Sequence, residues 1–210
     1  MTRRPISVFI KKLRRPVFTT HELAKLSGKS VSNVSQSLNF LEKQGLIVKI
    51  YRGIWAEAGN EYISPYAAIP FLLPRHRLYV SFISALHLHG IIEQIPQVIT
   101  LASTGHTKVI KTTIAVFSIH KISPLFFKGF DWYKGGKGNF LIAEPEKALV
   151  DCLYLASRKK KAFKFFPELH FPDSFSIKKT KAWAKSIPDK KIRVSVIKKL
   201  EEILKINYPA

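Results

Sequence analysis

The clearest hydrophobic pattern of the chain lies at residues 19–56, where two helical patterns are followed by two β-rich runs. Thr19 can cap the first helix, and Glu22 can bond back to the cap amide. Gly28 supplies a turn, and Ser30 is the next capping residue. Apolar residues then recur at helical spacing: Leu23 and Leu26 in the first helix, and Val31, Val34, Leu38 and Leu41 in the second. This pattern predicts two helices joined by a tight turn.

A short β-hairpin is predicted directly after the second helix. Gly45 is placed to end that helix, and the runs 46–50 and 54–56 flank a turn at Arg52 and Gly53. Helix, turn, helix and hairpin in this order are the elements of a winged helix-turn-helix, which binds DNA. The sequence therefore predicts an N-terminal domain of this kind.

The face of the second helix opposite the apolar residues begins with small hydrogen-bonding side chains, which suit the major groove. Basic residues of the hairpin can contact phosphates or enter the minor groove. A solvated helix face is the alternative interpretation. Phe40 does not fit a polar face, and we expect it to pack on the wing or on the rest of the chain. The predicted DNA contacts are Thr19, Thr20, Lys29, Ser30, Ser32, Asn33, Gln36, Lys49, Tyr51 and Arg52.

The composition agrees with a polyanionic partner, because the chain has 35 Lys and Arg residues and 14 Asp and Glu residues, which gives a formal net charge of +21. The charge is concentrated at the two ends: residues 1–57 hold 11 basic and 3 acidic residues, and residues 158–199 hold 14 and 3. Gly, Asn and Pro punctuate residues 57–65. We therefore predict two domains, a winged helix-turn-helix at 1–57 and a larger domain at 65–210.

The larger domain is predicted to mix helices and strands, which makes the whole chain α+β. Residues 78–89 are expected to form a buried helix ended by Gly90, and residues 144–156 another helix. Strands are expected at 98–101, 112–119 and 140–142, with a loop or hairpin tip at 134–139. The C-terminus is expected to form two lysine-rich helices, whose docking residues are Ile187, Ile192, Val196, Leu200 and Ile203.

A second basic surface is a further candidate, because charge and aromatic residues alternate at 158–166. It could contact a DNA backbone, or an acidic or RNA-associated partner. A face of solvated lysines is the alternative. The candidate residues are Arg158, Lys159, Lys160, Lys161 and Lys164.

We expect no cofactor, no metal and no catalytic residues. The segment 134–139 lacks the Ser or Thr and the spacing of a phosphate-binding loop. His87 and His89 are two residues apart on a predicted helix and point in different directions, so they cannot chelate a metal together. The single cysteine, Cys152, lies in an apolar run and is expected to be a buried thiol. With no export signal or membrane span evident, a cytoplasmic location without membrane contact is expected.

Two phrases in the middle of the chain resemble a known family. Residues 64–96, which include SALHLHG at 84–90, and residues 140–156, which include IAEPEKALVD at 142–151, lie in this order behind a winged helix. They are similar to the central segments of the AbiEi antitoxins of type IV toxin-antitoxin pairs. The resemblance implies a repressor of its own promoter that also counters a nucleotidyltransferase-like toxin. In such pairs a stable complex with the toxin is not to be assumed.

Two other functions are alternatives to this one. A metal-dependent DNA nuclease could use Asp131, Glu144, Glu146 and Lys147, but the spacing differs from the Glu-x-Lys step of such sites, and Pro145 indicates a helix start. A transcription factor unrelated to any toxin is the second alternative. The sequence therefore predicts a non-enzymatic DNA-binding repressor with antitoxin activity.

Overall fold

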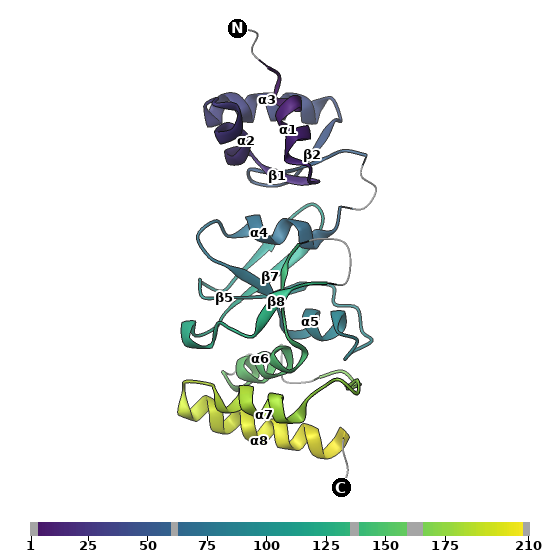
Figure 1. The fold of residues 1–210 in the computed structure, drawn as a ribbon, viewed down its shortest axis with the longest axis vertical. Coiled ribbons are helices and arrows are strands. Elements are labelled where there is room, and N and C mark those ends of the chain that lie inside the picture. Colours follow the sequence, from purple (N-terminus) through teal and green to yellow (C-terminus); the bar gives the residue numbers. More distant parts are fainter. Residues whose placement is uncertain (1–3, 60–62, 135–138, 159–165, 208–210) are drawn as a thin grey trace. The chain divides into compact units, whose positions relative to one another are not determined.

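The computed structural model describes residues 4–59, 63–134, 139–158 and 166–207. Their contacts divide the chain into two compact units (Figure 1). The first unit is mainly Met1–Pro74 with Lys111–Ala115, and the second comprises Arg75–Ile110, Val116–Lys134 and Phe140–Ala210. The boundary between separately folding domains at residues 57–65 stays a prediction.

The first unit contains the predicted helix-turn-helix and hairpin, preceded by one further helix and strand. Both predicted caps are present. The hydroxyl oxygen of Thr19 accepts a hydrogen bond from the backbone N–H of Glu22, and that of Ser30 accepts one from the backbone N–H of Asn33, each with a donor–acceptor distance of 3.2 Å. Gly45 has a φ of 71° just past the second helix, as a helix-ending glycine requires. The elements are α1 (Ile6–Leu13), β1 (Val17–Thr19), α2 (Thr20–Ser27), α3 (Val31–Lys43), β2 (Ile47–Tyr51), β3 (Ile54–Glu57), the 3-10 turn η1 (Pro65–Ala68) and α4 (Ile69–Leu72).

A three-stranded antiparallel sheet in the order β1-β3-β2 closes this unit. One apolar cluster joins the helices to the sheet; it includes Ile10, Phe18, Leu23, Val34, Leu38 and Trp55. The expectation that Phe40 packs on the wing or the rest of the chain was wrong, because Phe40 is 61% exposed. Leu26 and Val31 are 45% and 43% exposed, so the apolar residues of α2 and α3 are not all buried. Helical spacing identifies the apolar face, but a residue at the edge of that face is covered only if a neighbouring element reaches it.

The second unit is built on a six-stranded mixed sheet, in the order β6-β7-β5-β4-β9-β8. The α+β fold class is thereby confirmed. The predicted helix at 144–156 is present as α6, and the predicted strands at 98–101 and 140–142 are present as β5 and β9. The elements are β4 (Leu78–Val80), α5 (Phe82–Leu88), β5 (Ile99–Ser103), β6 (Lys108–Lys111), β7 (Val116–Lys121), the 3-10 turn η2 (Pro124–Phe126), β8 (Phe130–Trp132), β9 (Leu141–Ala143), α6 (Pro145–Ser157), α7 (Ile177–Lys185) and α8 (Lys190–Asn207).

Two predicted elements begin later than the sequence suggested. The single helix predicted at 78–89 is instead strand β4 followed by helix α5, with Phe82 at a φ of 58° where the chain changes direction. The strand predicted at 112–119 begins only at Val116, because Thr112 and Ala115 close a turn through a hydrogen bond of 3.0 Å. Apolar runs this short fit a strand and a buried helix equally well.

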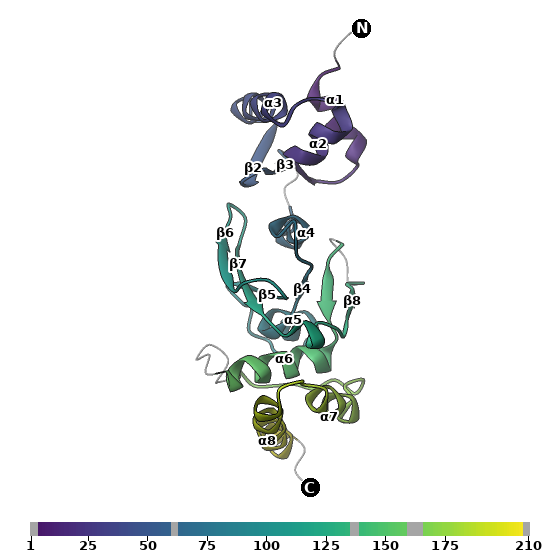
Figure 2. The same ribbon diagram turned by 90° about the vertical axis from the view of Figure 1, so that its left-hand side faces the viewer.

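Helix α6 lies between the sheet with α5 and the pair α7 and α8, which form the outermost layer of this unit (Figure 2). The two lysine-rich helices dock as predicted, with Ile187, Val196 and Leu200 buried. Gly129 allows a close approach to α7, because a Cβ at Gly129 would lie 2.5 Å from Cζ2 of Trp183. The φ of Gly129, 77°, independently favours glycine.

Candidate nucleic-acid interface

Helix α3 presents its small polar side chains to solvent. Val34 and Leu38 are fully buried and fix the rotation of the helix against the core of the first unit. On the opposite face Ser32, Asn33 and Gln36 are exposed, together in the first half of the helix. This is the half that contacts base edges in helix-turn-helix proteins. The arrangement can therefore offer amide and hydroxyl groups to a major groove.

The hairpin that follows α3 is short and firmly attached. Its turn has Gly53 at a φ of 71°, and the Gly53 carbonyl accepts a 3.0 Å hydrogen bond from the backbone N–H of Thr20. Lys49 and Arg52 are exposed, and the Lys49 ammonium lies 5.2 Å from the ring centroid of Trp55. Tyr51 is half-buried. The hairpin thus supplies two cationic side chains that a phosphate can reach.

Three other predicted contact residues have partners inside the unit. Thr20 is 5% exposed, and its hydroxyl oxygen accepts a 2.9 Å bond from Nε1 of Trp55. The Thr19 hydroxyl serves the capping box of α2 with Glu22. The Lys29 ammonium donates a 3.1 Å hydrogen bond to the backbone carbonyl of Arg4. These groups hold the start of α2 and the turn before α3 in place.

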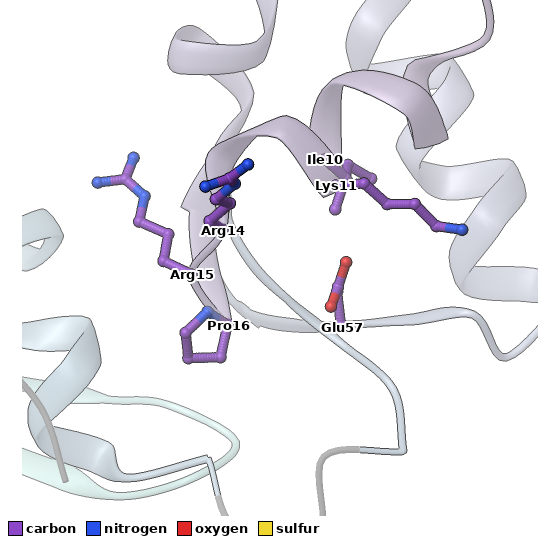
Figure 3. Close-up of a pocket in the computed structure, with 6 residues that line it drawn as sticks. All are labelled: Ile10, Lys11, Arg14, Arg15, Pro16 and Glu57. Atoms are coloured by element: carbon purple, nitrogen blue, oxygen red, sulfur yellow. The ribbon is translucent and has the colours of Figure 1, made fainter.

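A hollow of about 370 Å³ beside α1 gathers further basic residues that sequence reasoning did not single out (Figure 3). Its lining residues are Ile10, Lys11, Arg14, Arg15, Pro16 and Glu57. The Glu57 carboxylate lies among the cationic side chains. Arg15 is ion-paired with Glu22, and its guanidinium lies 5.1 Å from the ring centroid of Phe71. Because an acidic side chain lies among the cations, we assign no anionic ligand to this hollow.

Of the predicted second basic surface, the structure describes Arg158 alone. Its guanidinium donates to the Tyr154 hydroxyl over 3.3 Å. Lys159, Lys160, Lys161 and Lys164 lie outside the described residues. In the predicted loop at 134–139, residues 135–138 are likewise not described, although the flanking strands β8 and β9 pair antiparallel.

The carboxylates that a nuclease could use are engaged in contacts of the fold, and Glu144 and Glu146 share the Lys179 ammonium as an ion-pair partner. Asp131 is exposed on β8, where its carboxylate accepts from the N–H of Trp132. The Glu144 carboxylate accepts a 3.2 Å hydrogen bond from Nε1 of Trp183, and the Glu146 carboxylate accepts a 3.0 Å hydrogen bond from the backbone N–H of Ser176. The described residues include no group of three or more His, Cys, Asp or Glu side chains placed to hold a metal ion.

Lys147 belongs to a fully buried network between β4 and α6. Its ammonium is ion-paired with Asp151, whose carboxylate also accepts from Ser81 over 2.7 Å and from Tyr79 over 3.0 Å. The ammonium also lies 3.8 Å from the ring centroid of Phe126. Burial lowers the pKa of Lys147, and the Asp151 carboxylate opposes that shift. Burial, reinforced by the charge of Asp151, raises the pKa of Tyr79. This network joins the sheet to the helix.

The remaining candidates for chemistry are also engaged in the fold. Cys152 is buried, as predicted, and burial raises the pKa of its thiol. His89 Nε2 lies 2.7 Å from the carbonyl oxygen of Ala143, which ties α5 to β9. His87 is half-buried on α5. Among the described helices, none combines the length and the apolar character needed to cross a bilayer.

Comparison with known proteins identifies part of the first unit. Residues 10–49 match a family model described as the bacterial regulatory protein, arsR family. The match runs from the end of α1 through α2 and α3 into β2. No curated protein matches the chain. The match supports the winged helix-turn-helix assignment, and the chain carries the DNA-binding domain of a transcriptional regulator.

Proposed function

We propose that the protein is a cytoplasmic, non-enzymatic repressor of its own promoter and the antitoxin of a type IV toxin-antitoxin pair. The observation that carries the DNA-binding half is the exposed face of Ser32, Asn33 and Gln36, followed by the hairpin with Arg52. The antitoxin half rests on the resemblance of residues 84–90 and 142–151 to AbiEi antitoxins.

In the proposed complex, α3 enters the major groove of double-stranded DNA. Ser32, Asn33 and Gln36 contact base edges, because Asn and Gln can pair with adenine. Lys49 and Arg52 contact phosphates, with Ser30, Lys29 and Tyr51 at the margin. Thr19 and Thr20 contribute indirectly in this proposal, since their hydroxyls support α2 and the hairpin. They position the side chains that meet the DNA.

The two segments that carry the family resemblance are neighbours in the second unit. Residues 84–90 include most of α5, and residues 142–151 include the end of β9 and the first part of α6. The bond between His89 and Ala143 joins them. We propose that the second unit, whose interior these two segments help to build, serves the antitoxin function against a nucleotidyltransferase-like toxin. A stable complex between the two proteins is not required.

A transcription factor without a toxin partner is the second candidate, because the family match covers residues 10–49 alone. A DNA nuclease is not favoured, since Glu146 and Lys147 are buried in contacts of the fold.

The two halves of the proposal can be tested in one experiment with the full chain. The triple variant N33A/Q36A/R52A should lose binding to the native promoter in a gel shift. It should nevertheless protect growing cells from the toxin encoded by an adjacent nucleotidyltransferase-like gene. Wild-type protein that binds the promoter but gives no protection would contradict the antitoxin role and leave the transcription factor. Wild-type protein without any preference for the promoter would contradict the repressor role.

A further inference from the structure

Val31 is an exposed apolar residue at the first position of α3, and the proposed function does not use it. Helical spacing puts it on the buried side of the helix, because Leu38 lies seven residues further on, a rotation of only about 20°. Leu38 is fully buried, whereas Val31 is 43% exposed. Helical side chains tilt toward the N-terminus of their helix. The side chain of Val31 therefore leans toward the start of α3, where the core covers it only in part.

The first turn of α3 holds Val31 in a fixed position. The Ser30 hydroxyl oxygen accepts a 3.2 Å hydrogen bond from the backbone N–H of Asn33, and the Ser30 carbonyl accepts a 3.1 Å bond from that of Val34. Val34 is fully buried and anchors this turn to the core of the first unit. Valine is branched at Cβ, so in a helix it adopts one strongly preferred χ1 rotamer. Its two methyl groups therefore lose little conformational entropy when a partner packs against them.

The surroundings of Val31 suit DNA better than a protein partner. Ser32 and Asn33, which follow it, are exposed and can form hydrogen bonds. The first turn of α3 contains no acidic residue, although the helix dipole favours a carboxylate there, so nothing in this turn repels a phosphate backbone. Between residues 20 and 37 the other large apolar side chain that is exposed is Leu26. Two such side chains are fewer than the apolar centre of a protein interface contains.

The major groove offers one apolar group to a side chain like that of Val31. Base edges present donors and acceptors there, and the single exception is the C5-methyl group of thymine. A valine cannot bond to the donors and acceptors, but it removes apolar surface from water when it packs on that methyl group. The N-terminal residues of the second helix are the ones that contact base edges in helix-turn-helix proteins. In the groove, Val31 therefore has one complementary partner.

We propose that Val31 packs against the 5-methyl group of a thymine and selects a T·A pair at that position of the operator. This inference rests on the proposed function, because it requires α3 to lie in the major groove. Asn33 and Gln36 point to the same base pairs, since amide side chains pair with adenine, the partner of thymine. The thymine methyl lies on one strand, so the contact also distinguishes T·A from A·T. The first half of α3 thus selects A·T pairs and fixes the orientation of one of them.

The test removes the two partners of this contact separately. Thymines of the promoter fragment are replaced one at a time by deoxyuridine, which lacks only the 5-methyl group, and the affinity of the full-length protein is titrated. For the wild type, one replacement in each half of a symmetric operator, or one in all, should weaken binding about fourfold per contact, the factor for burying one methyl group. For Val31→Ala the same replacement should leave the affinity unchanged. Alanine has the higher helix propensity, so the variant should keep its fold.

Val8→Ala is the matched control, because Val8 is 36% exposed on α1 of the same unit. It should bind as the wild type does and keep the fourfold effect of deoxyuridine. If no deoxyuridine effect disappears in Val31→Ala, or if this variant loses the same affinity for promoter and scrambled DNA, the inference is overturned although promoter preference remains. Wild-type affinity for DNA together with lost self-association in sedimentation would overturn it too, and would assign Val31 to a protein interface. A wild type without promoter preference would instead contradict the proposed function itself.

Discussion

Helices α3 and α6 have the same length and opposite surroundings. Each spans 13 residues, yet two residues of α3 are buried against eleven of α6. On α3 the polar residues Asn33 and Gln36 are exposed, whereas on α6 Lys147 and Asp151 are 0% exposed and paired with each other. Polar groups inside the fold use their hydrogen bonds to hold elements together, and those outside remain available to a partner.

The difference in burial between α3 and α6 follows from the number of sides on which each helix is covered by other elements. Helix α3 packs on one side, through Val34 and Leu38, against the core of the first unit. Helix α6 is covered on one side by the sheet and α5 and on the other by α7 and α8. A charged residue on α6 must therefore find its partner within the second unit. The comparison predicts that substitutions on α6 change stability, and that substitutions on the exposed side of α3 change binding.

The largest effect is expected for Asp151→Ala. This change leaves the Lys147 ammonium buried without its counter-ion, and breaking a buried pair in this way costs about 3–5 kcal/mol of unfolding free energy. Urea denaturation would measure it. The double variant K147M/D151L, which removes both charges, should recover most of the loss. If the double variant is as unstable as Asp151→Ala, the loss of unfolding free energy does not come from an unpaired charge at Lys147.

Smaller effects are expected for substitutions on the exposed side of α3, and they should appear in DNA binding and not in stability. Asn33→Ala or Gln36→Ala should each weaken promoter binding by about 1–3 kcal/mol while scrambled DNA is bound almost as before. Unfolding free energy should stay within about 0.5 kcal/mol of wild type, because both side chains are exposed. Asn39→Ala, at an exposed site later in the same helix, is the matched control and should cost less affinity. Equal losses on both DNAs would show that this face only positions the protein.

The buried thiol of α6 gives a pH-dependent effect on stability of at most about 1.4 kcal/mol per pH unit. Burial raises the pKa of Cys152 above its usual 9.0, so above pH 9 the unfolded chain loses this proton while the folded chain retains it. Ionisation then favours unfolding, and stability falls as the pH rises. In Cys152→Ala this contribution is absent, so the gap in unfolding free energy between wild type and variant should narrow between pH 9 and 10. A constant gap would show that the thiol ionises equally in both states.

The smallest expected effect is a difference in unfolding free energy between two serine substitutions at the start of α3. Ser30→Ala removes the cap that accepts from Asn33 N and should cost about 1 kcal/mol in unfolding free energy. Ser32→Ala, on the exposed side just inside the helix, should change stability by less than about 0.5 kcal/mol. Thermal unfolding of the two variants checks this order. The reverse order would mean that Ser32, not Ser30, supports the helix.

The sequence predicted local features better than the environment of each residue. Caps at Thr19 and Ser30 were predictable because each depends on residues within one turn. Helix α1 was not predicted although Ile6, Phe9, Ile10 and Leu13 have helical spacing, because its eight residues span little more than two turns, too few for the period to stand out. The buried pair of Lys147 and Asp151 depends on Tyr79 and Ser81, about 70 residues away. Contacts of that kind leave no periodic signal in a single sequence.

The candidate site shows the same limit. The exposure of Ser32, Asn33 and Gln36 follows from the burial of Val34 and Leu38, which helical spacing predicted. The attachment of Thr20 to Trp55 depends on the pairing of β1 with β3, which the sequence did not predict. The lysines of α7 and α8 were visible in the sequence, but which of them stay exposed depends on the packing of both helices on α6.

The close contact between Gly129 and Trp183 constrains the order in which this protein can change during evolution. A methyl group at Gly129 meets the indole ring at 2.5 Å, so it becomes tolerable only after residue 183 has become smaller. The φ of 77° at Gly129 keeps a cost even then, and Asn is the side chain best suited to reduce it. Shrinking Trp183 in turn gives up its bond to Glu144. Descendants that vary at position 129 should therefore already differ at position 183, and the two sites should diverge as a pair.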